Sequence, residues 1–196
     1  MSLNKTNKFT AYILIIIIAP LIGAAYGVIN DQITYTISEE YYTKFKFMQF
    51  GQMYWESAEN IGTEDAPEIK LVNPRLGVAA VGIYATWEVG LFIGIILGLF
   101  GVFHRTGAEM YRITLRALGI TLALTALAGL AGFIYGKYFL LETPPNWWMS
   151  DSLIEKDRFI IVGSIHNFSY LGGLIGMFLG IVYTIAQRYK ASTRFS

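Results

Sequence analysis

The few side chains that could do chemistry inside an apolar environment are the first feature to place. Glu88 is the one carboxylate within a long apolar block, and His166 lies inside another such block. Counted at about 1.5 Å per residue from Phe103, Glu88 lies roughly 22 Å from the end of its block, and His166 falls at a similar depth. A carboxylate in hydrocarbon must find a hydrogen-bond or ion-pair partner or become protonated. Inserting an ionised carboxylate costs about 2.5–3.5 kcal/mol on insertion scales. We therefore expect Glu88 and His166 to face the protein interior within reach of each other.

Other polar side chains fall near the same depth on the four apolar blocks. Besides Glu88 and His166, the candidate polar site comprises Asn30, Asp31, Tyr84, Tyr135 and Asn167. Such a layer could receive a small ligand, an ion or a lipid headgroup. A purely structural interpretation competes with it, in which Glu88 is a protonated packing residue and His166 is its hydrogen-bond acceptor.

Three classes of function are compatible with these residues. The sequence favours an accessory or structural subunit, bound to other membrane proteins or to a second copy of the chain. The alternative is a ligand-binding or transport protein, although four helices are few for an autonomous transporter. The third class is a membrane enzyme with a metal between Glu88, His166 and Asp31, whose spacing is not diagnostic. No catalytic residue is assigned, and metal and cofactor stay unknown.

Several other functions have no support in the sequence. It contains no Walker loop, no dinucleotide fingerprint, no HExxH and no GxSxG, and no basic patch for nucleic acid. Cysteine is absent, which excludes disulfides, iron–sulfur clusters and thiolate metal sites. His104 and His166 lie toward opposite sides of the membrane, which argues against a haem held by both within one chain, although a dimer could pair two copies of one.

Four apolar blocks must position these side chains. Of the 196 residues 54% are hydrophobic, and the blocks span residues 9–29, 76–103, 113–135 and 159–185. Each is long enough to cross a hydrocarbon core about 30 Å thick, and each is continuously apolar, which favours helices. The first block could pass for a signal peptide, but its apolar run is longer than a signal core. We expect an all-α fold, a single membrane domain (1–196) built as a bundle of four transmembrane helices.

The segment 30–75 between the first two blocks is long enough to have structure of its own. Alternating polar and apolar residues predict a short extended stretch at 32–37, and Ser38 followed by two acids predicts a helix N-cap. We expect a helix over 39–57 whose aromatic rings and lysines lie at the membrane surface, although a strand at 44–47 stays open. A polar loop follows at 56–68. The second outer loop, 136–158, contains aromatic residues typical of a membrane interface.

Two glycine triplets at four-residue spacing predict close helix packing in lipid. They comprise Gly90, Gly94 and Gly98 in the second block and Gly172, Gly176 and Gly180 in the fourth. A weak internal repeat relates residues 21–27 to 130–136, which suggests two helical hairpins related by a pseudo-twofold axis.

Two strings carry a resemblance to known sequences. They are DQITYTISEEYYTKFKF at 31–47 and HNFSYLGG at 166–173. Both resemble a family of uncharacterised bacterial four-helix membrane proteins, and the similarity covers most of the chain. The resemblance implies a bacterial inner-membrane location, and it implies no activity, cofactor or partner.

The distribution of charge predicts the orientation in the membrane. Twelve of the fourteen acidic residues fall in the segments 30–75 and 136–158. The other ends of the blocks carry bases with Glu109 as the only acid; these bases are Lys5, Lys8, Arg105, Arg112, Arg116, Arg188, Lys190 and Arg194. Because Lys and Arg near helix ends stay on the cytoplasmic side, we expect both termini to be cytoplasmic.

Reporter fusions test this orientation. We expect reporters placed after Lys8, Thr106 and Ser196 to be cytoplasmic, and those near Glu64 or Ser150 to be exported, because the positive-inside rule acts most strongly on the short turn around Thr106. Paired alkaline phosphatase and fluorescent-protein fusions measure both outcomes. An exported reporter at Thr106 would overturn the assignment of the helices.

Overall fold

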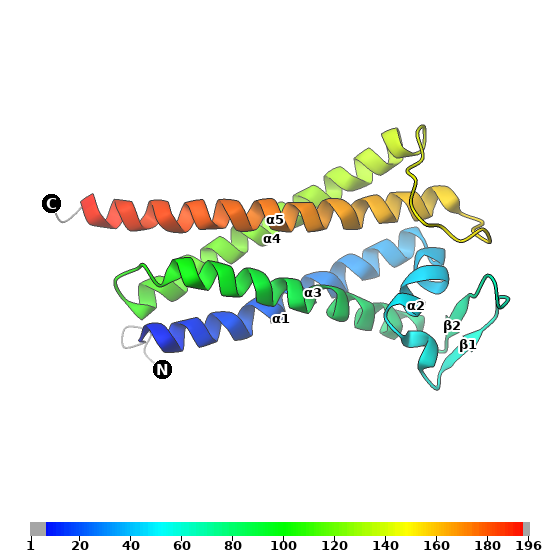
Figure 1. Cartoon of the computed structure of the whole chain (residues 1–196), viewed down its shortest axis with the longest axis horizontal. Helices are drawn as coiled ribbons and strands as arrows, with labels where there is room; N and C mark the ends of the chain where they lie inside the picture. Colours follow the sequence, from blue (N-terminus) through cyan, green and yellow to red (C-terminus); the bar gives the residue numbers. More distant parts are fainter. Residues whose placement is uncertain (1–6, 194–196) are drawn as a thin grey trace. The chain divides into compact units, whose positions relative to one another are not determined.

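Four long apolar helices pack as a bundle in the computed structural model, which describes residues 7–193 (Figure 1). The helices are α1 (Lys8–Ile37), α3 (Pro74–Gly101), α4 (Gly107–Tyr135) and α5 (Lys156–Thr193). Each has the length and the composition to cross a membrane. The expected all-α bundle of four spanning helices is therefore confirmed. Lys5, Arg194 and Ser196, on which the orientation argument partly depends, lie outside the described residues.

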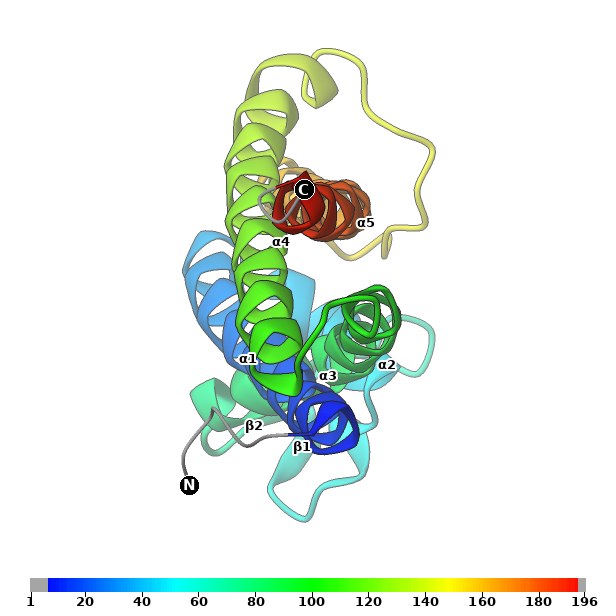
Figure 2. The ribbon, with the colours of Figure 1, turned by 90° about the vertical axis from the view of Figure 1, so that its left-hand side faces the viewer.

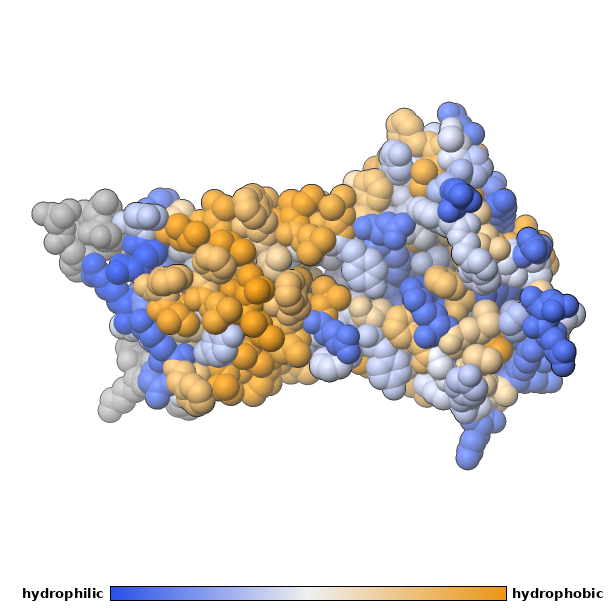
Figure 3. All heavy atoms as spheres, in the orientation of Figure 1, coloured by the Kyte–Doolittle hydropathy of each residue, from blue (hydrophilic) through white to orange (hydrophobic). Residues whose placement is uncertain are grey.

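The chain divides into two compact units, and each helix contributes a segment to both. Unit 1 comprises Met1–Gly23, Thr86–Leu127 and Ser169–Ser196, and unit 2 comprises Ala24–Ala85 and Ala128–Phe168. Figure 3 shows hydrophobic side chains covering most of the visible helical surface of unit 1, whereas polar side chains are frequent on the visible surface of unit 2. The apolar surface of unit 1 is what a lipid-facing bundle requires, because there is no water to solvate its side chains.

Glycines let the helices of unit 1 approach each other closely. A Cβ added at Gly90 of α3 would lie 2.6 Å from the carbonyl oxygen of Ala19 on α1. On α5, a Cβ at Gly176 would lie 2.7 Å from the Cα of Thr121 on α4. Figure 2 shows α1 beside α3 and α4 beside α5 in this unit. Gly90 and Gly176 thus face the neighbouring helix of their own hairpin, whereas a Cβ at Gly180 would lie nearest to Leu97 of α3, 3.1 Å away. We propose that the contacts of Gly90 and Gly176 hold the pairs together.

The prediction for this packing compares two glycines of unit 1. We expect Gly176→Ala to destabilise the protein by about 1–3 kcal/mol, because the new methyl group would overlap the backbone of Thr121. Gly119 is the matched control, since a Cβ there would meet no atom within 4 Å. Gly119→Ala should leave stability unchanged or slightly raised, because alanine is the better helix former. Thermal unfolding in one detergent measures both, and equal shifts in Tm would contradict the packing role.

In unit 2, α1 continues as a helix to Ile37, so the extended stretch expected at 32–37 is wrong. The buried residues of this stretch recur at helical spacing: Asp31, Thr34, Tyr35 and Ser38. The Thr34 hydroxyl donates a hydrogen bond to the carbonyl oxygen of Asn30, 3.0 Å away, as a helical threonine can. The alternating pattern over six residues was too short to distinguish a strand from one face of a helix.

Ser38 separates α1 from the next helical segment. Its side-chain oxygen accepts a hydrogen bond of 3.3 Å from the backbone amide of Tyr41, which confirms the predicted cap. A π-helical turn (Tyr42–Lys46) leads into α2 (Phe47–Gln49), so the strand considered at 44–47 is excluded. The helix ends before 57, because Gly51 has a φ of 77° and turns the chain into a single 3₁₀ turn.

A small hairpin replaces part of the loop expected at 56–68. Strands β1 (Ala58–Asn60) and β2 (Ile69–Leu71) pair antiparallel, with Glu59 opposite Lys70. Ile69 and Leu71 are buried while Lys70 between them is exposed, which is the period-two pattern of a half-buried strand. The Asn60 side chain closes the connecting loop by accepting 3.0 Å hydrogen bonds from the amides of Gly62 and Glu68.

The aromatic residues of this segment, apart from the exposed Tyr54, form a protein core and not a membrane-surface layer. Tyr41, Tyr42 and Phe47 are buried together with Phe159 and Val162 of α5. The rings meet edge to face or tilted, with the Tyr41 and Phe159 centroids 4.8 Å apart. Aromatic rings that can cover one another lose more water contact than rings lying singly at an interface, which explains why the expected position was wrong.

Glu40 connects this core to the loop that precedes α5. Its carboxylate accepts hydrogen bonds from the backbone amides of Ile154 and Glu155, at 3.0 and 2.6 Å, and pairs with Lys44. Lys44 is buried and also donates to the carbonyl oxygen of Ser152, 2.8 Å away. Burial acts to raise the pKa of Glu40, but the Lys44 ammonium and the two amides outweigh it and lower the pKa. The expectation that Lys44 reaches for lipid headgroups is therefore wrong.

Candidate functional site

The central feature of unit 2 is a buried pair formed by Asp31 of α1 and His166 of α5. Nε2 of His166 lies 3.1 Å from Oδ1 of Asp31, and the two residues are 7% and 3% exposed. Nδ1 of His166 lies 2.9 Å from the carbonyl oxygen of Val162. Asn30 adds a 3.2 Å hydrogen bond from its amide to the same carboxylate oxygen. Both ring nitrogens of His166 are thus engaged, and its partner is Asp31 where Glu88 was expected.

Hydrogen-bond geometry determines how many protons the pair carries. The Val162 carbonyl can only accept, so Nδ1 of His166 carries a proton. Nε2 faces a carboxylate oxygen, and two lone pairs at 3.1 Å would repel each other, so a second proton lies between them. The pair is either a carboxylate with an imidazolium or a carboxylic acid with a neutral imidazole. Its net charge is zero in both cases, which is what a site with little solvent contact requires.

Aromatic and basic side chains enclose the pair. The Tyr41 ring stacks on the imidazole of His166, with centroids 5.1 Å apart and planes 19° apart. The Lys46 ammonium lies over three rings, at 5.7 Å from Tyr41, 5.1 Å from Phe45 and 5.2 Å from Phe50. Burial lowers the pKa of Lys46, while the charge of Asp31 acts against that shift. Lys46 was expected at the membrane surface, and it is buried instead.

The Tyr42 hydroxyl completes the surroundings of Asp31. It lies 2.7 Å from the Thr34 hydroxyl. Burial, and after it the negative charge of Asp31, raise the pKa of Tyr42 well above its ordinary value, so the phenol stays protonated. The segments 31–47 and 166–173 therefore meet here, because Asp31 and Tyr41 of the first contact His166 of the second.

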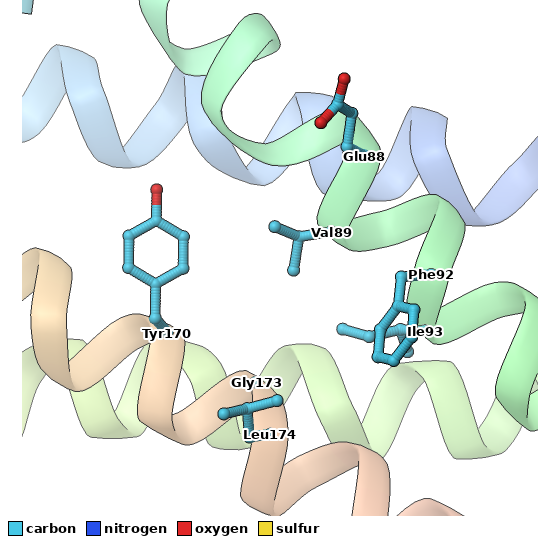
Figure 4. Close-up of a pocket in the computed structure, with 7 residues that line it drawn as sticks. All are labelled: Glu88, Val89, Phe92, Ile93, Tyr170, Gly173 and Leu174. Atoms are coloured by element: carbon cyan, nitrogen blue, oxygen red, sulfur yellow. The ribbon is translucent and has the colours of Figure 1, made fainter.

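Glu88 has a different environment, in unit 1. It is exposed, so the expectation that it faces the interior is wrong. It lies at the rim of a hollow of about 350 Å³ whose walls come from α3 and α5 (Figure 4). We name this hollow the Glu88 groove; its residues are Glu88, Val89, Phe92, Ile93, Tyr170, Gly173 and Leu174. Figure 4 shows the Glu88 carboxylate directed away from the α5 side chains, so the floor of the groove is apolar and its one charge lies at the edge.

The remaining residues of the expected polar layer do not join the buried pair, except Asn30. Tyr84 is about half exposed on α3, and Asn167 is exposed on α5. Tyr135 packs against the rings of Phe139 and Phe168, 5.3 and 5.2 Å away. Among the described residues, no three His, Asp or Glu side chains come close enough to hold a metal, so the metal-enzyme hypothesis has no site there.

Sequence reasoning missed Tyr41, Tyr42 and Lys46 as neighbours of the buried pair. Their aromatic and basic character was visible but fits a membrane surface equally well. No spacing rule would have found them, because they lie on a π-helical turn, which shifts the side chains from the ordinary helical period.

No family model, curated protein or solved structure matches the chain. A role is therefore assigned from the chemistry of the Glu88 groove in unit 1 and of the Asp31–His166 pair in unit 2.

Removal of one member of the buried pair is the test of its structural importance. We expect His166→Leu to lower the free energy of unfolding by about 3–5 kcal/mol, because it leaves Asp31 buried without the imidazole. Asp31→Asn should lower the free energy of unfolding by less, since the side-chain amide can still donate a hydrogen bond to Nε2 of His166. Unfolding in mixed micelles gives the values. Asn167→Leu, at the exposed neighbouring position, serves as the control. If it lowers the free energy of unfolding as much as His166→Leu does, the pair does not contribute specially to stability.

Proposed function

We propose that this protein is an accessory subunit of the bacterial cytoplasmic membrane that binds a transmembrane helix of a partner protein in the Glu88 groove. Both termini are cytoplasmic in this proposal, as the distribution of Lys and Arg favours. The observation that carries the proposal is an exposed carboxylate, within a spanning helix, at the rim of an open apolar groove.

The energetic argument starts from the position of Glu88 in α3. The helix crosses the membrane, and Glu88 lies about 20 Å along it from Gly101, within a hydrocarbon core about 30 Å thick. A carboxylate facing lipid at that depth costs about 2.5–3.5 kcal/mol, which snorkelling relieves only in part. A donor or a basic side chain of a partner helix would relieve the rest, because an ion pair gains strength where water is excluded.

The shape of the groove supports a helix as the occupant. Its walls are two helices, its floor contains Gly173, and Val89, Phe92 and Leu174 supply the apolar contacts. A glycine between larger apolar residues lets another backbone approach closely, which is the main route to tight helix packing in lipid. A small ligand is the alternative occupant, since about 350 Å³ lies within the range of small-molecule sites.

By contrast, the buried Asp31–His166 pair supports a structural role. Nε2 of His166 and Oδ1 of Asp31 bind each other, and Tyr41 covers the imidazole. The second carboxylate oxygen, Oδ2, is buried and has no hydrogen-bond partner among the described residues. Access for a ligand would require the aromatic core of unit 2 to open. In this proposal the pair positions helices, and binding takes place at the Glu88 groove.

Photo-crosslinking in native membranes tests the proposed role. A benzophenone amino acid at Phe92, in the groove, should form an adduct with one partner protein, because a bound helix would lie against this ring. The same probe at Phe178 of α5, exposed and outside the groove, is the matched control and should give no such adduct. Glu88→Gln should weaken the Phe92 adduct several-fold, and Glu88→Leu should abolish it, because the pairing charge and then the hydrogen bonds are lost.

The outcomes separate the candidates. An adduct of twice the chain mass assigns the groove to a second copy of this protein, and an adduct with a different protein assigns it to a heterologous partner. A lipid adduct alone supports the small-ligand alternative. If the Phe92 adduct is equally strong in Glu88→Leu, Glu88 is not part of the binding surface and the proposal fails.

A further inference from the structure

A second hollow in unit 1 lies near the turn between α3 and α4. It has a volume of about 420 Å³, and its lining comprises Phe100, Phe103, Thr184, Ile185, Arg188 and Tyr189. Phe103 and Tyr189 are largely exposed, so the hollow opens to the surroundings of the protein. Most of the lining side chains are apolar or aromatic, and one, Arg188, is a permanent cation. This combination fits neither a purely apolar packing defect nor a soluble-ion site.

One nitrogen of the Arg188 guanidinium lacks a hydrogen-bond partner among the described residues. It is the Nη1 atom, which is buried. A guanidinium stays charged at any physiological pH and has five N–H donors to place. An unpaired buried donor of this kind is costly, so an acceptor bound in the hollow would stabilise it.

His104, in the same turn, makes no hydrogen bond to this guanidinium. It is fully buried, and neither ring nitrogen has a hydrogen-bond partner among the described residues. Burial lowers the pKa of His104, Glu109 opposes this shift from 3.7 Å away, and Arg188 adds to it. The other carboxylate oxygen of Glu109 accepts the backbone amide of Arg105, 3.1 Å away. The nearby acid is therefore engaged elsewhere.

The surroundings have a surplus of positive charge. The Lys8 ammonium donates to the carbonyl oxygen of Val102, 2.9 Å away, which places the start of α1 beside the same turn. Arg112 and Arg116 are exposed on the first turns of α4. A cluster of bases of this kind at the end of membrane helices attracts anionic lipid in general. Of the described bases at this end of the protein, only Arg188 lines the hollow, so it alone can select a lipid bound there.

We propose that this hollow binds one anionic phospholipid, whose phosphate accepts hydrogen bonds from Arg188 and whose acyl chain lies along Phe100, Phe103 and Ile185. The apolar walls distinguish this ligand from a free phosphate ion, which would gain nothing from them. The phenol of Tyr189 lies at the opening, where an aromatic ring with a polar tip is favourable at headgroup level.

Lipid titration followed by native mass spectrometry tests this site. The purified full chain in detergent should bind phosphatidylglycerol at least tenfold more tightly than phosphatidylcholine, with one high-affinity lipid per chain. Arg188→Gln should remove most of this tenfold preference, and Arg188→Lys should retain part of it, because lysine keeps the charge but not the forked donor geometry. Arg116→Gln removes one exposed base from the same end of the protein and should change the preference less than twofold.

Four results would overturn the proposal. The first is a wild-type preference for phosphatidylglycerol below twofold, which decides the matter even if Arg188→Gln does not fold. The second is an equal loss in Arg188→Gln and Arg116→Gln, which would show a general effect of surface charge. The third is displacement of the lipid by millimolar glycerol phosphate, which would identify a site for soluble phosphate. The fourth is a photo-crosslinker at Phe103 that captures a protein in native membranes and no lipid.

Discussion

Satisfying one buried carboxylate is the constraint on which unit 2 depends. Asp31 is almost fully buried on α1, and the imidazole of His166 on α5 meets it at 3.1 Å. A hydrogen bond fixes both distance and direction, so one of these helices cannot slide a turn past the other without leaving a buried charge alone. The chain that leaves α1 then turns at Ser38 and returns over the pair, where Tyr41 stacks on the imidazole. The aromatic core and the hairpin are built on this arrangement.

Unit 1 is held together by different means. Its helices approach through glycines, as at Gly90 against Ala19 and Gly176 against Thr121, and the attraction comes from close van der Waals contact. Such contacts involve no charged side chain and no side-chain hydrogen bond. The charged groups of this unit are therefore not used in them. Glu88 is exposed there, and Nη1 of Arg188 has no hydrogen-bond partner among the described residues. Unit 2 differs in that its central carboxylate, Asp31, is buried and binds His166 through one oxygen.

The sequence predicted the four helices well because length and hydropathy alone decide whether a segment crosses a membrane. The prediction was wrong where the periods of a helix and of a strand agree over a few residues. This happens at 32–37, which forms the end of α1. The Lys44 and Lys46 side chains were expected to snorkel toward headgroups, but paired acids and aromatic rings made burial favourable.

The partner of His166 could not be predicted, for a geometric reason. Counting residues along a helix gives the height of a side chain but not its direction around the axis. Asp31 and Glu88 were both placed near the height of His166, and the choice between them depended on how the helices are rotated. Helix rotation follows from packing of many side chains together, which one sequence does not reveal without contacts between helices.

The neutrality of the Asp31–His166 pair has an electrical consequence. A single charge crossing the whole membrane would do about 2.3 kcal/mol of work per 100 mV. Moving the shared proton between Nε2 and Oδ1 displaces it by at most 3.1 Å. That distance is roughly a tenth of the hydrocarbon thickness, so even a displacement along the membrane normal would couple to the potential by only about 0.2 kcal/mol per 100 mV. A proton transfer within the pair would thus respond only weakly to the membrane potential, so this connection between α1 and α5 is poorly suited to sensing voltage.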